Sequence, residues 1–262
     1  MKLKMEKSPK SHLFPGKKRQ AQSCKLMNGR RIAAKCGRSS FCKWRTTLEN
    51  GQCAFNQMAT AEAWARGWTL TRGKPRPVNQ TYGCKIDLGA PDHLERHVVS
   101  NFDAQALREL SSSLTVPGTW LKVCASPEMV TPFLRDIWTV QPLEYLMAAT
   151  LRKDAIIARD DYQLSIRTSS AVTDAELRSK DGQLAARGRV AQSNGFAIFD
   201  QIVTEPEHQR KGLGRIVMGA LSNVSIAGGS KIGVLVATED GRALYKTIGW
   251  TIVSLVTAAV IG

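Results

Sequence analysis

The segment 209–215 places basic, polar and glycine residues where an amphipathic helix is expected to begin. The preceding run, 195–203, is nearly continuous in apolar residues and predicts a strand. A strand that turns through Gly212 and Gly214 into a helix exposes unpaired backbone N–H groups and a partial positive charge, and these bind anions. The sequence therefore predicts a site for a phosphorylated cofactor. The candidate phosphate-binding residues are Gln209, Arg210, Lys211, Gly212, Leu213, Gly214 and Arg215.

Two common phosphate-binding motifs do not describe this segment. The loop of nucleoside triphosphatases requires G-x-x-x-x-G-K-[ST], and no such ending follows Gly212 or Gly214. The dinucleotide fingerprint G-x-G-x-x-G/A requires a small residue where this chain has Val217, and it normally follows the first strand of a domain. Both motifs are therefore disfavoured.

Two motifs of the chain resemble those of the GNAT superfamily of N-acyltransferases. The pattern Q/R-x-x-G-x-G/A, which binds the acetyl-CoA pyrophosphate in that family, is matched by Gln209, Gly212 and Gly214. Further on, 243-ALYKTIGW-250 resembles the family's C-terminal A-x-LY-x-x-x-GF/W signature and also follows an expected strand. The resemblance is strongest over residues 184–261 and reaches back to about residue 60.

The resemblance implies a fold and a cofactor. The fold is of the mixed α/β class, a GNAT-like, mostly antiparallel central sheet flanked by helices. In the family, the strand before the loop is bulged and splays from its neighbour, and the pantetheine arm bonds to the exposed backbone. By resemblance, that backbone belongs to Gln201, Ile202 and Val203. Acetyl-CoA is then the acyl donor, and no metal is expected.

Two side chains are candidates for the chemistry. Tyr245 matches the family's tyrosine beside the CoA sulfur, where a hydroxyl protonates the leaving thiolate; the alternative is a packing role. Asp200 is the sole carboxylate on 195–203 and is the candidate general base; the alternative is a structural role in orienting the loop. One departure is that Glu239 and Asp240 stand where many members carry Asn, which affects the expected hydrogen bonding near the thiol.

The positive charge of the chain is concentrated at its start. Residues 1–50 hold 14 Lys and Arg against Glu6 and Glu49, which accounts for +12 of the net charge of +15. Because this region lacks apolar periodicity, residues 1–54 are expected to form a disordered basic extension, and residues 55–262 the GNAT-like domain. Without interleaved aromatic residues, a solvated tail is favoured over a nucleic-acid-binding arm.

The six cysteines give no metal-binding spacing. They contain no C-x-x-C pair, so reduced, unlinked thiols are expected and no metal or catalytic thiol is predicted. The first 30 residues lack the apolar core of a secretory signal, and the apolar run 250–261 is shorter than the ~20 residues of a membrane helix. A cytoplasmic protein that does not enter the membrane is expected. The cysteines are Cys24, Cys36, Cys42, Cys53, Cys84 and Cys124.

The pattern of apolar residues predicts alternating strands and helices. A hairpin is expected through Ser193, Asn194 and Gly195, and Gly228 with Gly229 is expected to end the helix after the loop. The sequence shows no internal repeat. Strands are expected at 82–89, 95–100, 119–125, 184–192, 195–203, 232–237 and 250–261, and helices at 57–68, 103–114, 213–224 and 239–249.

Together these features predict an N-acyltransferase that moves an acetyl group from acetyl-CoA to an amine by direct attack. Two alternatives stay open: a non-catalytic acyl-CoA sensor of the same fold, and a nucleic-acid adaptor acting through the basic extension. The acceptor, a small molecule or a peptide, is not identified by the sequence. In the family it is bound by the variable N-terminal half, where Trp120, Trp138 and Tyr145 are either pocket or core residues. A homodimer is left open.

Overall fold

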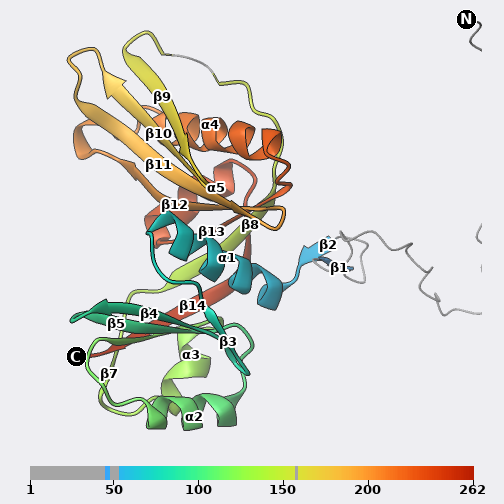
Figure 1. Ribbon diagram of the computed structural model, residues 1–262, viewed down its shortest axis with the longest axis vertical. Helices are drawn as coiled ribbons and strands as arrows, with labels where there is room; N and C mark the ends of the chain where they lie inside the picture. The colour runs from blue at the N-terminus through green and yellow to red at the C-terminus, as the bar shows by residue number, and fades with distance from the viewer. Residues whose placement is uncertain (1–44, 48–52, 157–158) are drawn as a thin grey trace, which may run out of the picture. The chain divides into compact units, whose positions relative to one another are not determined.

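A sheet of 12 strands runs through the part of the chain that the computed structural model describes, residues 45–47, 53–156 and 159–262 (Figure 1). Its order is β3-β4-β5-β6-β14-β8-β13-β12-β11-β10-β9, and β7 pairs with β14 beside this path. The strands are β3 (Val78–Gln80), β4 (Gly83–Ala90), β5 (His93–Val99), β6 (Thr119–Val123), β7 (Trp138–Val140), β8 (Glu144–Thr150), β9 (Tyr162–Ser169), β10 (Val172–Ser179), β11 (Leu184–Ser193), β12 (Phe196–Thr204), β13 (Ile232–Ala237) and β14 (Thr251–Ile261).

The sheet is mostly antiparallel, as the sequence predicts. Among the described strands only two neighbouring pairs are parallel, β5 with β6 and β12 with β13. A separate antiparallel pair is formed by β1 (Arg45–Thr47) and β2 (Cys53–Phe55). The helices are α1 (Gln57–Thr71), α2 (Ala104–Ser113), α3 (Pro127–Val130), α4 (Leu213–Ala227) and α5 (Glu239–Thr247), with single 3-10 turns at Thr131–Phe133 and Pro206–His208.

Local sequence signals fix several of these boundaries. The side chains of Asn56 and Asp103 cap α1 and α2 by accepting backbone N–H bonds of 3.0 and 2.7 Å. Asn194 and Gly195 adopt φ values of 51° and 82°, the left-handed conformations that a tight hairpin between β11 and β12 requires. All the strands and helices predicted from the sequence are present, with ends shifted by a few residues.

Strands β8, β9 and β10 are not predicted by the sequence pattern. In β10, alternate residues are buried, but charged and polar side chains such as Asp174 and Glu176 stand between them, which weakens the apolar signal. In β9 most side chains are exposed or half-buried because it lies at the end of the sheet. The predicted disorder of residues 1–54 concerns mainly residues outside the described ones.

Helices cover both faces of the sheet around β12 and β13. Alternate side chains of β12 belong to two cores: Ala197 and Phe199 pack with α4 and α5, whereas Phe196 and Ile198 pack with α1. A third core lies under α2 and includes Leu107, Leu121 and Trp138. Since β12 is buried on both faces, its nearly continuous apolar sequence follows from its central place.

One order of elements occurs twice in the described chain, although the sequence shows no repeat. In the first half, the hairpin β4–β5 leads through α2 to β6, which is parallel to β5. In the second half, the hairpin β11–β12 leads through α4 to β13, which is parallel to β12. The last strand of each half pairs with the other half. Strand β14, at the end of the second half, pairs with β6, and β8, at the end of the first half, pairs with β13. The two halves therefore share one continuous sheet.

Candidate active site

The predicted phosphate-binding segment forms the turn into α4. Gly212 is the N-cap residue, with a left-handed φ of 78° and no side chain to cap the helix. The first intrahelical bonds run from the N–H groups of Arg215 and Ile216 to the Gly212 carbonyl oxygen. The N–H groups of Leu213 and Gly214 precede these bonds at the positive end of the helix dipole. This backbone is suited to bind an anion.

Polar contacts hold the loop in place. The Gln209 side chain donates to the Thr204 carbonyl oxygen at 3.3 Å, so it ties the loop to the end of β12. Arg159 donates to the Lys211 carbonyl oxygen at 3.0 Å and adds a cation that sequence reasoning does not find. No motif marks Arg159, because it reaches the loop from a distant segment. The side chains of Arg210, Lys211 and Arg215 are exposed around the helix start.

Strand β12 is bulged before the loop. Arg189 pairs with Asp200 and Arg187 pairs with Val203, so Gln201 and Ile202 lie opposite the single residue Gly188. Gln201 has a φ of 54°, a left-handed conformation that costs energy in any residue except glycine. A Cβ on Gly188 would lie 2.4 Å from Ile202 Cδ1, so glycine is needed there to accommodate the bulge.

Strand β12 also separates from β13, and the separation begins before the bulge. The two strands pair only at three positions, from Phe196 opposite Ile232 to Ile198 opposite Val234. The backbone of β12 from Phe199 onward is therefore not paired with β13. The bulged residues Gln201 and Ile202, and Val203 after them, lie on this separated part. That the pantetheine arm binds to their backbone stays a prediction from the family resemblance.

Asp200 is held by an ion pair at the bulge. Its Oδ2 accepts from Arg72 Nε at 2.9 Å and from Thr71 Oγ1 at 2.8 Å, and its Oδ1 accepts from Arg72 Nη2 at 3.2 Å. The carboxylate side chain is 13% exposed. Both oxygens are thus engaged by residues at the end of α1, an arrangement that fixes the strand against the helix. No motif in the sequence marks Arg72 for this contact.

Tyr245 lies on α5, and its side chain is buried in the core. Its ring centroid lies 6.0 Å from that of Trp250, the other aromatic residue of the C-terminal motif. Burial, with a smaller contribution from the Asp200 charge, raises the pKa of Tyr245 to about 12. The hydroxyl is therefore protonated at neutral pH and can act as a donor.

Glu239 takes part in a local network at the start of α5. Its carboxylate accepts from Arg242 on the same helix, and Arg242 also lies over the Tyr145 ring at 4.9 Å. The hydrogen bonds from Arg242 and then Tyr145 lower the pKa of Glu239 to about 2. This residue, where many GNAT members have Asn, is thus an ionised partner of Arg242 and Tyr145.

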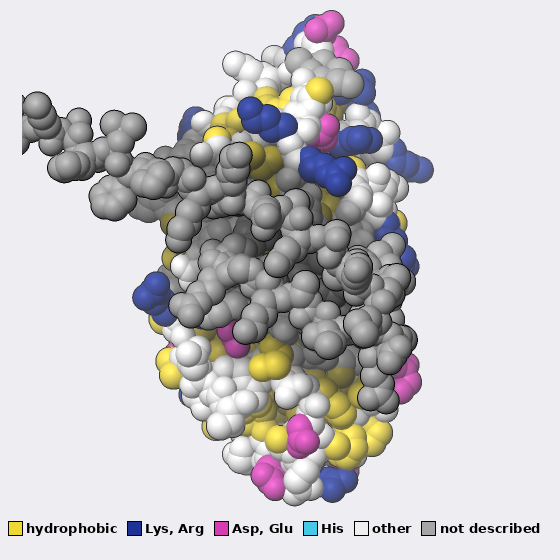
Figure 2. All heavy atoms as spheres, turned by 90° about the vertical axis from the view of Figure 1, so that its right-hand side faces the viewer, with side chains coloured by type: hydrophobic (Ala, Val, Ile, Leu, Met, Phe, Trp, Pro, Cys, Tyr) yellow, Lys and Arg dark blue, Asp and Glu magenta, His cyan; other side chains and the backbone are white. Residues whose placement is uncertain are grey.

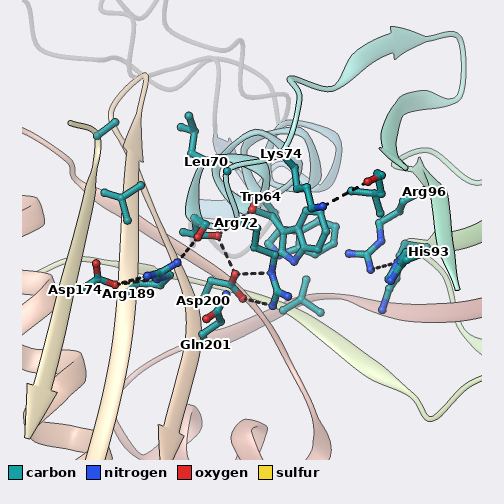
Figure 3. Close-up of a pocket in the computed structure, with 18 of the residues that line it drawn as sticks. Trp64, Leu70, Arg72, Lys74, His93, Arg96, Asp174, Arg189, Asp200 and Gln201 are labelled. Carbon is teal, nitrogen blue, oxygen red and sulfur yellow. Dashed lines mark hydrogen bonds and ion pairs between the residues drawn. The ribbon is translucent and has the colours of Figure 1, made fainter. Parts of the chain in front are cut away.

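A cavity of about 910 Å³ opens beside the separated strands (Figure 3). Asp200 and Gln201 line it from β12 and Val236 from β13, so it reaches the gap between those strands. The cavity contains more cations than carboxylates. Other lining side chains come from α1 and the turn after it (Trp64, Trp68, Arg72 and Lys74), from β5 and β6 (His93, Arg96 and Lys122), from β8 (Glu144), and from β10 and β11 (Asp174 and Arg189).

The three tryptophan and tyrosine candidates for the acceptor pocket have different places. Trp138 is buried in the core under α2, where its Nε1 donates to the Ser111 carbonyl oxygen. Trp120 and Tyr145 line a second cavity of about 590 Å³, which shares Lys122 with the first. Trp120 also stacks on His93, with 4.7 Å between ring centroids. Two of the three are therefore exposed to cavities and one is not.

Two cysteines have described side chains, and both lie in the core. Cys84 and Cys124 are free and buried, and burial raises the pKa of each thiol to about 12, so neither forms a thiolate near neutral pH. Within residues 45–47, 53–156 and 159–262, no group of three His, Cys, Asp or Glu side chains could hold a metal ion. The helices described there are all too short or too polar to cross a membrane.

Comparison with known proteins agrees with this geometry. The family described as FR47-like protein matches residues 177–257, which include the bulged strand, the loop and the Tyr245 segment. A GCN5-related N-acetyltransferase from Kribbella flavida has a similar structure, with a TM-score of 0.57 and 14% identity, over 78% of this chain and 95% of that one. This chain therefore has the fold of the GNAT acetyltransferases.

A second solved GNAT structure supports the same fold. The GCN5-related N-acetyltransferase from Sphaerobacter thermophilus has a TM-score of 0.50 at 10% identity, over 67% of this chain and 75% of that one. No curated protein matches the sequence. At such identities the likeness shows the fold alone, and the reaction has to be argued from this chain's own residues.

Proposed function

We propose that this GNAT domain transfers an acetyl group from acetyl-CoA to the amine of an acceptor. The observation that carries the proposal is the separation of β12 from β13 next to the uncapped start of α4. A gap between strands with free backbone groups suits the extended pantetheine arm, and the helix start suits the pyrophosphate. The same gap opens into the large cavity, where an acceptor can meet the thioester (Figure 3).

The cofactor is bound mainly by backbone in this proposal. Gln201, Ile202 and Val203 offer N–H and C=O groups to the pantetheine, and the N–H groups of the turn from Gly212 to Gly214 bind the pyrophosphate. Arg210, Lys211 and Arg215 surround the phosphates with positive charge, and Gln209 holds the loop. In Figure 2, which looks onto the right-hand side of Figure 1, several Lys and Arg side chains lie in the upper part of the molecule.

The reaction is a direct attack of the neutral amine on the thioester carbonyl. The C–N bond forms, the C–S bond breaks, and the electron pair of that bond goes to the CoA sulfur. Tyr245 is proposed to donate its proton, or a hydrogen bond, to this sulfur. Because an ordinary thiol has a pKa well below the value of about 12 for Tyr245, hydrogen bonding carries the larger share.

The amine must lose a proton during the reaction, and Asp200 is the base predicted from the sequence. Both of its carboxylate oxygens already accept hydrogen bonds from the end of α1, from Arg72 and Thr71, and its side chain is 13% exposed. The structure therefore favours the alternative role, in which Asp200 positions β12 and its bulge. The proton then leaves through water in the cavity.

The proposal is tested by calorimetry and by a transfer assay. Titration of CoA and acetyl-CoA into the folded protein should give binding heat, and a panel of amino acids, polyamines, aminoglycosides and peptides should reveal thiol release with one acceptor class. A folded protein that gives no heat with CoA would remove the proposal. Binding without release for any acceptor would favour the acyl-CoA sensor instead.

The nucleic-acid adaptor makes a different prediction, because its working part is the basic extension, which lies mainly outside the described residues. Salt-sensitive retention on nucleic acid that disappears when residues 1–50 are deleted would support it. Two other expectations also stay predictions. Cell fractionation tests the cytoplasmic location, and the mass of the protein in solution tests whether it forms a homodimer.

A further inference from the structure

The cationic side chains of the 910 Å³ cavity exceed its carboxylates by two. Five cations face three carboxylates, and each carboxylate already has a cationic partner. Asp200 pairs with Arg72, Asp174 with Arg189 at 2.8 Å, and Glu144 with Lys122. The two cations that remain are Lys74 and Arg96.

These two cations have different surroundings. Lys74 is exposed, so water can solvate its ammonium group. Arg96 is 6% exposed, and its Nε is buried with no hydrogen-bond partner. A buried guanidinium without a counter-ion is costly, because it has lost its hydration without gaining an ion pair. Arg96 is therefore a buried positive charge whose carboxylate partner is absent from the described side chains.

The protein holds Arg96 firmly despite this cost. Its guanidinium carbon lies 4.1 Å from the centroid of a Trp68 ring, which gives a cation–π contact. Its Nη2 donates to His93 Nε2 at 2.7 Å (Figure 3). Burial lowers the pKa of Arg96 to about 10, although Glu144 and Asp200, which are both paired with other cations, favour its charged form from a distance. The planar group is thus oriented but not neutralised.

His93 does not compete for an anion. Burial and the nearby cations Arg96, Lys122, Arg72 and Lys74 lower the pKa of His93 to about 4, so the ring is neutral at physiological pH. A neutral ring can accept the Arg96 hydrogen bond at Nε2 and leaves Arg96 as the charged group. His93 therefore orients the guanidinium without adding charge of its own.

We propose that the acceptor of this enzyme is an amine that also carries a carboxylate, and that the Arg96 guanidinium binds this carboxylate. One unpaired buried charge matches a monoanion, and the fork of a guanidinium matches the two oxygens of a planar carboxylate. The amine of the same molecule then points toward Gln201 and Val236, at the gap between β12 and β13. The acceptor class is thus amino acids and related amino carboxylates. The inference rests on the proposed acetyl transfer.

The test compares amines that differ only in the carboxylate. Amino carboxylates of increasing length, from glycine to 4-aminobutyrate, are assayed with acetyl-CoA beside their amides, and the rates are compared per concentration of neutral amine. The wild type should prefer the acids by about 10- to 100-fold in kcat/KM, the range expected for a charge-assisted pair. In Arg96→Gln that preference should disappear through KM, while the affinity for CoA stays unchanged.

Two further variants make the result specific. Arg96→Lys keeps the charge without the fork and should retain a reduced preference, which also covers the case in which Arg96→Gln does not fold. Arg108→Gln is the matched control, because Arg108 also lies over an aromatic ring, Phe133, but is exposed and outside the cavity. It should behave like the wild type.

Direct binding separates this inference from the proposed function. The shift in thermal unfolding caused by each acid and amide is measured with CoA present, where no transfer occurs. Transfer to amides as fast as to acids, or an acid preference that survives in Arg96→Gln, would overturn the inference and leave the acetyltransferase intact. If acids but not amides stabilise the protein, and only when Arg96 is present, the carboxylate site is supported. If no amine is acetylated as well, the proposed acetyltransferase function is contradicted.

Discussion

Burial determines what Tyr245 can contribute to the reaction. With a pKa of about 12, the hydroxyl keeps its proton across the range in which such an enzyme works. Tyr245→Phe keeps the ring in the core and deletes only the donor, so turnover should fall by about 10- to 100-fold while CoA affinity stays the same. The shape of the pH–rate profile should not change. Unaltered turnover with a good acceptor would show that Tyr245 only packs.

The ion pair of Asp200 suggests a different result for its substitution. If Asp200 positions the bulge, Asp200→Asn and Arg72→Gln should each reduce kcat/KM by about 10-fold, and the double variant should be no worse than either one. The pH dependence of the rate should be preserved. Loss of the acidic limb of the profile in Asp200→Asn alone, with Arg72→Gln fully active, would instead identify a general base.

His93 couples folding to pH. Because its folded pKa of about 4 lies below the ordinary value of 6.5, the unfolded chain binds a proton that the folded chain rejects as the pH falls from 6.5 toward 4. The free energy of unfolding should be unaffected by His93 above pH 6.5 and should decrease below it. Urea unfolding at several pH values should show a shallower decrease in His93→Gln, whose amide oxygen can still accept from Arg96. Equal slopes would contradict this.

At the scale of elements, the turn into α4 has to pack against α5 and also leave its backbone N–H groups open to a ligand. A Cβ on Gly214 would lie 3.2 Å from Leu244 Cδ2 of α5 and 3.5 Å from Thr204 Oγ1. Gly214→Val should therefore destabilise the protein by about 1–3 kcal/mol through overpacking, and it should also weaken CoA binding by covering the backbone N–H groups. Thermal unfolding and calorimetry measure the two effects.

A second substitution separates the effect of Gly214→Val on stability from its effect on CoA binding. Leu244→Ala makes room beside position 214, so the double variant should recover much of the stability of Gly214→Val but not its CoA affinity. If CoA affinity returns together with stability, glycine at this position serves helix packing alone, and the turn is not the phosphate site.

At the scale of the whole described chain, the exchanged strands link the two halves. β14 pairs with β6 of the first half and β8 pairs with β13 of the second, so neither half completes its sheet alone. The chain should therefore unfold in a single transition. Leu121→Ala in the first half and Leu221→Ala in the second should each reduce the free energy of that unfolding by about 2–5 kcal/mol. Calorimetry and circular dichroism should give coincident curves.

An exposed position gives the control for this experiment. Met129 is 49% exposed, so Met129→Ala should change the stability by no more than about 0.5 kcal/mol. Two separate transitions, with each leucine variant shifting only one of them, would show that the halves unfold independently in spite of the shared sheet.

The sequence by itself determined the local features of the second half. Glycines at 212, 214, 228 and 229, the Asn194–Gly195 turn and the apolar period of α4 predict their elements because each signal acts between residues close in the chain. The same locality explains why the loop and the Tyr245 motif could be recognised together. The charged and polar residues of β10 and the largely exposed side chains of β9 carry no such signal, and neither strand was predicted.

Only the tertiary structure decided how distant charges combine. Arg72, Arg96 and Arg189 come from three different elements, and no spacing in the sequence relates them to Asp200 or Asp174. Whether such a cation is neutralised depends on which carboxylates lie within about 4 Å after folding, and that is a property of the packed sheet. The exchange of β8 and β14 is likewise set by pairing across the sheet, because strand order leaves no local trace in the sequence.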